Sequence, residues 1–132
     1  RMEIGIDLVE LHRIEAILKR KPRFAQRVLT PKELAYFQEL SLERKIEFLA
    51  GRFAVKEAYS KAVGYGLGRL TFQMIECLPS QFGKPLITQG PIIQETSVSI
   101  SHTKTMVQAS VLIALSQDQI DQKLAIFFDQ LI

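Results

Sequence analysis

The stretch LERKIEFLAGRFAVKEAYSKAV, residues 42–63, is the longest periodic segment of this chain. Its apolar residues recur at the spacing of an amphipathic helix, from Ile46 to beyond Phe53. Ser41 comes directly before it and can cap the first turn, and Gly64 follows it and can end the helix in the left-handed conformation. The stretch therefore predicts one long helix with defined ends.

The residues before the long helix predict one strand and three shorter helical segments. Alternation at the start of the chain indicates a strand in which Asp7 points away from the face of Ile4 and Ile6. Thr30 and Glu33 have the spacing of a capping box, with a proline at the first helical position. The expected segments are residues 3–9 as a strand and 11–21, 23–29 and 31–40 as helices.

The residues after the long helix are rich in strand signals. Gly83 lies in the expected turn of a hairpin, and apolar residues after Gln117 recur at the spacing of an amphipathic terminal helix. The expected strands are residues 72–78, 85–88, 97–101 and 107–115. Together the segments predict an α+β fold in a single domain, residues 1–132: one strand, a helical half and then an antiparallel sheet.

Composition is that of an ordinary globular protein. Hydrophobic residues make up 47% of the 132 residues and charged residues 23%, with a formal net charge of +3. Cys77 is the one cysteine, so no internal disulfide can form, and its apolar surroundings favour a buried, unreactive thiol. No apolar run is long enough to span a membrane and no secretion signal is evident, so we expect a cytoplasmic protein without a membrane partner.

Several polar groups lie where packing alone does not require them. Asp7 sits within a strand, Glu57 and Lys61 share one helix face, and His102 follows a short strand. Each also has an ordinary explanation: a solvent-facing or capping aspartate, a surface ion pair and a structural histidine. Residues 64–69, Gly-Tyr-Gly-Leu-Gly-Arg, form a glycine turn after the long helix; it is either a helix stop or a loop that approaches a phosphate closely.

These features together resemble the holo-[acyl-carrier-protein] synthases, the small bacterial type of 4′-phosphopantetheinyl transferase. Residues 5–10, Gly-Ile-Asp-Leu-Val-Glu, resemble the opening motif of that family, and Arg13-Ile14 follows it. Residues 51–62, GRFAVKEAYSKA, resemble its central motif, and residues 99–103, SISHT, its third. The chain departs from the family in Tyr65, in Met106 and in a tail beyond Leu115 that is longer than usual.

The resemblance implies transfer of 4′-phosphopantetheine from coenzyme A to a serine of apo acyl carrier protein, with adenosine 3′,5′-bisphosphate as the other product, in support of fatty acid biosynthesis. It implies Mg²⁺ held by Asp7 and Glu57, and Lys61 beside the transferring phosphoryl group. Either Glu57 or His102 is the candidate general base. The residues expected to contact coenzyme A are Lys45, Arg52, Ser60, Lys61, Gly64, Gly66, Pro85, His102 and Thr103.

The resemblance also implies two protein contacts. Acyl carrier proteins are acidic, and the N-terminal helices carry a basic cluster that would steer them, with Phe24 as an apolar anchor. The expected docking residues are Arg13, Arg20, Arg23, Phe24 and Arg27. Family members are trimers whose sites combine Asp7 and Glu57 of one subunit with His102 of the next. The apolar strand 107–115 fits either a subunit interface or the core of one chain.

Two other classes of function fit parts of this pattern. One is a different Mg²⁺-dependent phosphoryl-transfer or hydrolytic enzyme that uses the same two carboxylates. The other is a small basic module that binds nucleic acid. The basic residues lack the interleaved aromatic residues of a base-stacking surface, and such a module has no need of Asp7 and Glu57, so we expect no nucleic-acid partner.

Overall fold

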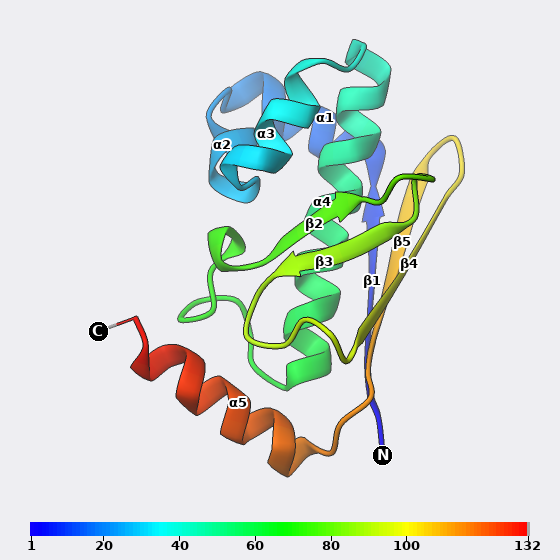
Figure 1. The fold of residues 1–132 in the computed structure, drawn as a ribbon. Helices are drawn as coiled ribbons and strands as arrows, with labels where there is room; N and C mark the ends of the chain where they lie inside the picture. Colours follow the sequence, from blue (N-terminus) through cyan, green and yellow to red (C-terminus); the bar gives the residue numbers. More distant parts are fainter. Residues whose placement is uncertain (132) are drawn as a thin grey trace.

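The long helix α4 (Leu42–Val63) forms the axis of the molecule, with a curved sheet along one side and a cap of short helices at one end (Figure 1). The structure, a computed structural model, describes residues 1–131. The short helices are α1 (Leu11–Arg20), α2 (Phe24–Val28) and α3 (Pro31–Gln38). The terminal helix α5 (Gln117–Asp129) lies at the opposite end (Figure 1).

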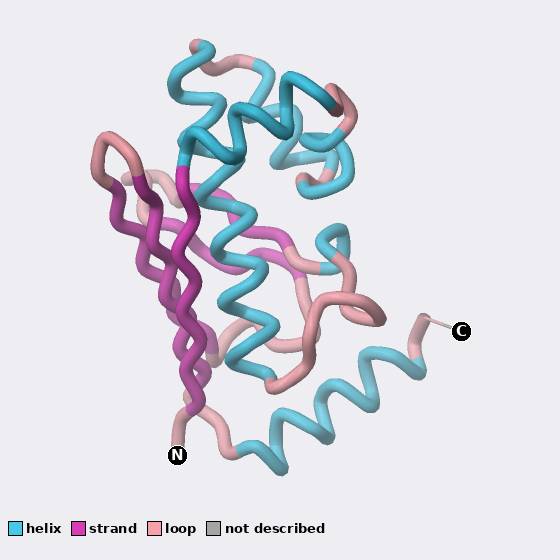
Figure 2. The backbone as a smooth tube through the Cα atoms, turned by 180° about the vertical axis from the view of Figure 1, so that it is seen from behind, coloured by secondary structure: helices cyan, strands magenta, loops and turns pink. Residues whose placement is uncertain are grey.

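The main sheet has three antiparallel strands in the order β1-β5-β4. They are β1 (Glu3–Glu10), β4 (Thr96–His102) and β5 (Met106–Ile113). The strand at the start of the chain is therefore not separate from the later sheet but its edge, paired along its length with β5. One face of this sheet packs on α4, and among the described residues no helix covers the other face (Figure 2).

A second, two-stranded sheet forms the predicted hairpin, with β2 (Glu76–Pro79) and β3 (Pro85–Gln89). Gly83 has the positive φ, 88°, that its turn requires. The expected strand over residues 72–78 is wrong in its first half, because Phe72–Met74 form a 3₁₀ turn, η1, with Thr71 as its N-cap. Helix α3 ends at Gln38, two residues before the predicted end.

Local capping decided most helix ends as the sequence predicts. The Thr30 hydroxyl accepts from Glu33 N and the Glu33 carboxylate accepts from Thr30 N at 2.8 Å, which completes the capping box. Ser41 caps α4 at its start, and Gly64 ends it with φ 80°. Ser116 caps α5 in the same way as Ser41 caps α4.

The apolar alternation of β1 is confirmed, but its apolar face points outward. Ile4, Ile6 and Leu8 are between 51% and 62% exposed, whereas Val9, on the same face as Asp7, is buried against α4. The buried face of β5 is the row that includes Val107, so this row belongs to the core of the single chain rather than to a subunit interface.

A buried polar network joins α3, α4 and the hairpin. Lys56 is fully buried and its ammonium lies 2.6 Å from Glu33 Oε1, while it also donates to the backbone carbonyl of Val28. Glu33 accepts from Cys77 N at 2.7 Å, and the Thr30 hydroxyl donates to Glu76. Burial lowers the pKa of Lys56, and the neighbouring Glu33 opposes that shift. The network therefore satisfies every charge that these elements carry into the core.

Two findings bear on the environment of the protein. Cys77 is buried as predicted, and burial raises the pKa of its thiol to about 11, so the thiol stays protonated at neutral pH. Within residues 1–131, none of the helices is both long and apolar enough to cross a bilayer.

Candidate active site

Gly5 allows the first strand to approach the long helix closely enough to build a site. A Cβ at this position would lie 1.8 Å from the carbonyl oxygen of Ala58 and 2.7 Å from the amide nitrogen of Ala62. These are backbone atoms of α4, so they cannot move aside as a side chain can. The absence of a side chain at Gly5 therefore sets the distance between β1 and α4, and with it the place of Asp7, two residues further along the strand.

Asp7 and Lys61 form the centre of the site. The Lys61 ammonium lies 3.3 Å from Asp7 Oδ1 and donates to the carbonyl of Ile6 at 3.0 Å. The Asp7 side chain is 17% exposed and the Lys61 side chain 55%, so the pair opens to solvent on the lysine side. The surface ion pair considered for Glu57 and Lys61 is not formed; the lysine instead reaches across to the strand.

Glu57 completes the cluster from the turn of α4 before Lys61. Burial raises the pKa of Glu57, and the negative charge of Asp7 raises it further, while Lys61 and Arg13 lower it. Three of the four residues expected at the reaction centre, Asp7, Glu57 and Lys61, therefore lie near one another, and His102 does not lie with them. Two neighbouring carboxylates that repel each other favour a cation between them.

These two carboxylates fit the requirements of Mg²⁺. The ion prefers oxygen ligands, and it usually takes only one or two carboxylates while substrate phosphates and waters fill the remaining positions. No group of three or more ligand-type side chains occurs among residues 1–131, so a closed, all-protein metal cage is not offered. Asp7 and Glu57 would hold the ion, on the open side that Lys61 shares.

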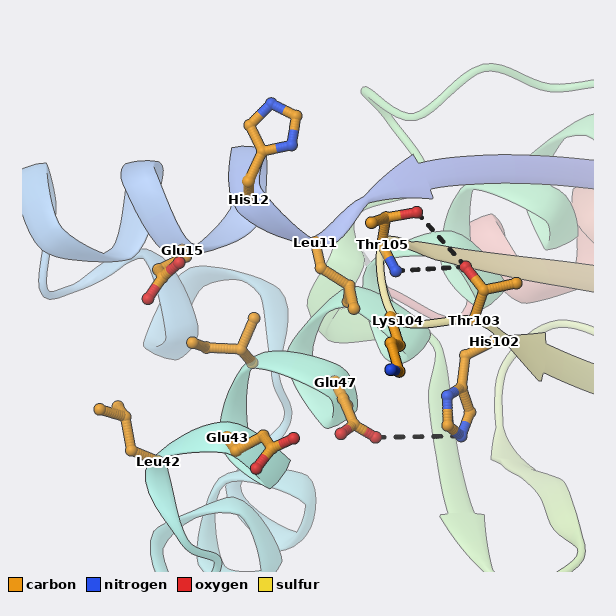
Figure 3. Close-up of a pocket in the computed structure, with 11 residues that line it drawn as sticks. Leu11, His12, Glu15, Leu42, Glu43, Glu47, His102, Thr103, Lys104 and Thr105 are labelled. Carbon is orange, nitrogen blue, oxygen red and sulfur yellow. Dashed lines mark hydrogen bonds and ion pairs between the residues drawn. The ribbon is translucent and has the colours of Figure 1, made fainter.

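His102 belongs to a different part of the surface. It lies at the end of β4, with Nε2 3.9 Å from Glu47 Oε2, and lines a cavity of about 860 Å³ (Figure 3). Glu57 is ten residues after Glu47, which is about 15 Å along the axis of α4. One chain therefore does not join His102 to the Asp7–Glu57–Lys61 cluster.

The cavity beside His102 contains residues that the sequence analysis did not select. It is formed where α1, the start of α4 and the β4–β5 turn meet (Figure 3). The Thr103 hydroxyl in this turn already forms local hydrogen bonds, because it accepts from the backbone nitrogens of Thr105 and Met106. The unexpected lining residues are Leu11, His12, Glu15, Leu42, Glu43, Ile46, Glu47, Lys104 and Thr105. No sequence signal marks them, because they come from three separate segments.

Two of the residues expected to contact coenzyme A are buried and form hydrogen bonds within the chain. Arg52 is 7% exposed, donates to the carbonyl of Cys77 at 2.9 Å and lies over the ring of Phe48 at 4.3 Å. Ser60 is 2% exposed and its hydroxyl donates to the Glu57 carbonyl of its own helix. This placement favours structural roles for both residues over the expected ligand contacts.

The remaining expected ligand contacts are spread over the surface. Lys45 lies over the Phe37 ring at 5.6 Å, near the start of α4. Pro85 begins β3, opposite Pro79. Gly64 caps α4, three residues after Lys61, and Gly66 is open to solvent with no atom within 4 Å of an added Cβ. Of these remaining residues, Gly64 and Gly66 are the nearest in sequence to Lys61.

The expected docking residues divide into two groups. Arg20, Phe24 and Arg27 line a groove of about 410 Å³ between α1, α2 and η1. Phe24 is half-buried and packs on Phe53, with ring centroids 6.1 Å apart, so its edge forms an apolar part of that groove. Arg23 is exposed beside the groove, whereas Arg13 lies close enough to Glu57 to lower its pKa.

The fold and the site define a class of protein: a small α+β domain in which a carboxylate pair and a lysine meet where β1 contacts α4. A sequence profile of the 4′-phosphopantetheinyl transferase superfamily matches residues 3–116, and the chain belongs to this superfamily. Within it, the chain is an enzyme of the holo-[acyl-carrier-protein] synthase type.

Relatives at high identity support this assignment. A holo-[acyl-carrier-protein] synthase of Streptococcus pyogenes is 50% identical over 109 residues, which cover 83% of this chain and 92% of that protein. A crystal structure of such a synthase from Bacillus anthracis, in complex with CoA (3′,5′-ADP), has 42% identity and a TM-score of 0.78 over 88% of this chain and all of that one. One from Helicobacter pylori, in complex with coenzyme A, has 37% identity and a TM-score of 0.72 over 84% of this chain and 99% of that one.

Proposed function

We propose that this protein transfers 4′-phosphopantetheine from coenzyme A to a serine hydroxyl of apo acyl carrier protein and releases adenosine 3′,5′-bisphosphate. The observation that carries the proposal is the Asp7–Glu57–Lys61 cluster, since each residue lies in a motif of the superfamily and the close approach at Gly5 brings them together. The setting fits phosphoryl transfer, which depends on positioning and on neutralising phosphate charge.

Each residue of the cluster has a part that its surroundings support. Asp7 and Glu57 would hold Mg²⁺, which would neutralise pyrophosphate charge when it is bound. The Lys61 ammonium, 55% exposed, faces the place where that charge develops. The serine oxygen forms a bond to the phosphorus as the bond from that phosphorus to the bisphosphate oxygen breaks. The serine proton passes to Glu57 or to His102, the two candidate bases.

A direct assay tests the transfer. The protein is incubated with apo acyl carrier protein, coenzyme A and Mg²⁺, and the carrier protein is weighed by mass spectrometry. We expect a gain of one phosphopantetheine unit. No gain with folded components refutes the proposal, and hydrolysis of coenzyme A without modification of the carrier would instead support a hydrolytic enzyme with the same carboxylates.

We further propose that the active form is a homotrimer in which His102 of one subunit completes the cluster of the next. Two observations support this assembly. The outer face of the main sheet exposes Ile4, Ile6 and Leu8, and an apolar row of this kind marks an interaction surface. Within one chain, His102 pairs with Glu47 rather than with the cluster residue Glu57.

Mixing two inactive variants tests the shared site. Under the proposal Glu57→Gln and His102→Ala are each inactive, but every mixed trimer contains one site with both residues intact. Random equimolar mixing should therefore recover about a quarter of wild-type activity. No recovery, with subunit exchange confirmed by native mass spectrometry, would show that each site is built within one subunit.

The groove lined by Arg20, Phe24 and Arg27 is the proposed docking surface for the carrier protein. It combines positive charge with an apolar floor, and the charge would steer an acidic partner. Arg13 is near enough to Glu57 to lower its pKa, so it would meet the serine-bearing segment rather than the groove. The proposed location is the cytoplasm, which suits the unpaired thiol of Cys77.

A further inference from the structure

The terminal helix α5 begins directly after the part of the chain that matches the superfamily. The match ends at residue 116, and α5 covers Gln117–Asp129. It is nevertheless part of the folded domain, since Ile120, Leu124 and Phe128 are each at most 5% exposed. The helix therefore packs one face on the domain in a fixed position.

The surface that α5 covers is the end of α4 and the glycine turn. The Gln117 amide donates to the carbonyl of Val63 at 3.0 Å, at the last residue of α4. Its Nε2 also lies 3.3 Å from where a Cβ on Gly64 would be. At the other end of the helix, the Phe128 ring packs on Tyr65 at 5.9 Å and lies 4.2 Å from the Arg69 guanidinium. The two ends of α5 thus contact both ends of the turn.

The turn is held by a few local hydrogen bonds, in which Tyr65 N donates to the Ser60 carbonyl at 3.0 Å and Gly68 N to the Leu70 carbonyl at 3.2 Å, but it is open to solvent. Residues 64–66, 68 and 69 are exposed, and an added Cβ on Gly66 or Gly68 would meet no atom within 4 Å. A glycine-rich segment loses much conformational entropy when it becomes ordered. If the turn were disordered before binding, part of the binding free energy of a ligand would be used to order it. Another element that already restricts the turn removes this cost.

We propose that α5 holds the glycine turn in the conformation that receives coenzyme A, with Gln117 and Phe128 as positioning residues. The inference rests on the proposed function and on the family resemblance, which implies that Gly64 and Gly66 contact coenzyme A; Gly64 comes three residues after Lys61. Because the turn is ordered before binding, α5 increases affinity for coenzyme A. It leaves the carboxylate cluster unchanged, since its contacts with the turn are made beyond Lys61.

Two substitutions with a matched control test this role. Phe128→Ala removes the contacts to Tyr65 and Arg69, and Gln117→Ala removes the contact at Val63 while leaving the apolar face of α5 intact. Ile126→Ala is the control, because this side chain is on the same helix and 59% exposed. The measurements are the Kd of coenzyme A by calorimetry, KM and kcat for transfer, and hydrogen exchange of residues 64–69.

For Phe128→Ala we expect the Kd and KM of coenzyme A to rise about three- to tenfold, with kcat and the KM of the carrier protein little changed. Gln117→Ala should give a smaller rise in the same direction, and both should speed exchange in the turn. Ile126→Ala should match the wild type. If the wild type transfers and both variants bind coenzyme A as it does, α5 has no positioning role and the proposed function stands. If the wild type binds no coenzyme A, both proposals fail.

Discussion

Single residues decide the chemistry because neighbours in the sequence face different surroundings. Lys56 and Glu57 are adjacent on α4, yet Lys56 is fully buried in an ion pair with Glu33 while Glu57 faces the site. Successive helical residues are about 100° apart around the axis. One therefore holds the helical cap to α4, and the other remains available for catalysis.

Replacement of Glu57 by glutamine should abolish transfer without unfolding the protein. The change would remove a proposed metal ligand and candidate proton acceptor but keeps the shape of a side chain that is only partly buried. We expect kcat to fall by at least about 100-fold. Thermal denaturation and mass-spectrometric assays provide the measurements, with Glu39→Gln, at an exposed carboxylate that follows the end of α3, as the control. Activity near that of the wild type would remove Glu57 from the reaction.

A methyl group at Gly5 should destabilise the fold as well as the site. The added Cβ would lie 1.8 Å from the Ala58 carbonyl oxygen, so β1 must move away from α4. We expect Gly5→Ala to lower the free energy of unfolding by more than about 3 kcal/mol, at or beyond the upper end for overpacking. Urea denaturation measures it. Gly68→Ala, where the added atom meets nothing within 4 Å, should change stability by less than about 1 kcal/mol. Equal effects at both positions would show that close approach is not the cause.

Helices α1 and α2 carry the basic residues proposed for docking, whereas α4 carries residues of the candidate reaction centre. The basic groove of Arg20 and Arg27 lies on the helical cap, while Asp7 and Glu57 lie along the β1–α4 contact. Arg13 is on α1, but its charge lowers the pKa of Glu57 in the candidate site. A substitution of Arg13 would therefore affect the site as well as docking. This division predicts that substitutions in the groove affect the carrier protein selectively.

Charge reversal at Arg20 should therefore raise the KM for the carrier protein about tenfold or more, while the KM for coenzyme A stays within about twofold. The physical reason is loss of attraction to an acidic partner. The KM for the carrier protein should therefore also depend less on salt concentration in the variant than in the wild type. Steady-state kinetics with each substrate varied in turn provide the measurement. Lys32→Glu, an exposed charge on α3 outside the groove, serves as the control. An equal rise for both substrates would contradict a docking role.

For the whole molecule, the outer face of the main sheet bears on whether a single chain or a trimer forms the complete active site. Ile4, Ile6 and Leu8 contribute to no core within the chain, although the other face of the same strand is packed on α4. The proposed trimer would cover this row. It would also account for the distance between His102 and Glu57 along α4.

A charge at the centre of this row should prevent assembly. We expect Ile6→Glu to be a folded monomer in light scattering and to lose transfer, because a buried unpaired carboxylate opposes association. Ile126→Glu, at a similarly exposed position on α5, should keep the oligomeric state of the wild type. A trimeric, active Ile6→Glu would show that this face is not the interface.

Local signals in the sequence were enough for the helices and for the motif residues. Capping at Thr30, Ser41 and Gly64 depends on hydrogen bonds within a few residues, so the bounds of α4 could be predicted. The strand alternation around Asp7 was equally readable. The start of β2 was not, because η1 depends on Phe72 packing against Phe53, far away in the sequence.

Which faces meet became clear only in the folded chain. Periodicity and capping are local, so they were enough to predict an α+β chain with Asp7 in one motif and Glu57 and Lys61 in another. It could not determine that the apolar face of β1 points outward, because burial depends on which element arrives to cover a face. Nor could it separate Arg52, held in the core, from Lys61, which reaches Asp7. The long-range contact at Gly5 brings the strand and helix backbones together and so places Asp7 within reach of Lys61.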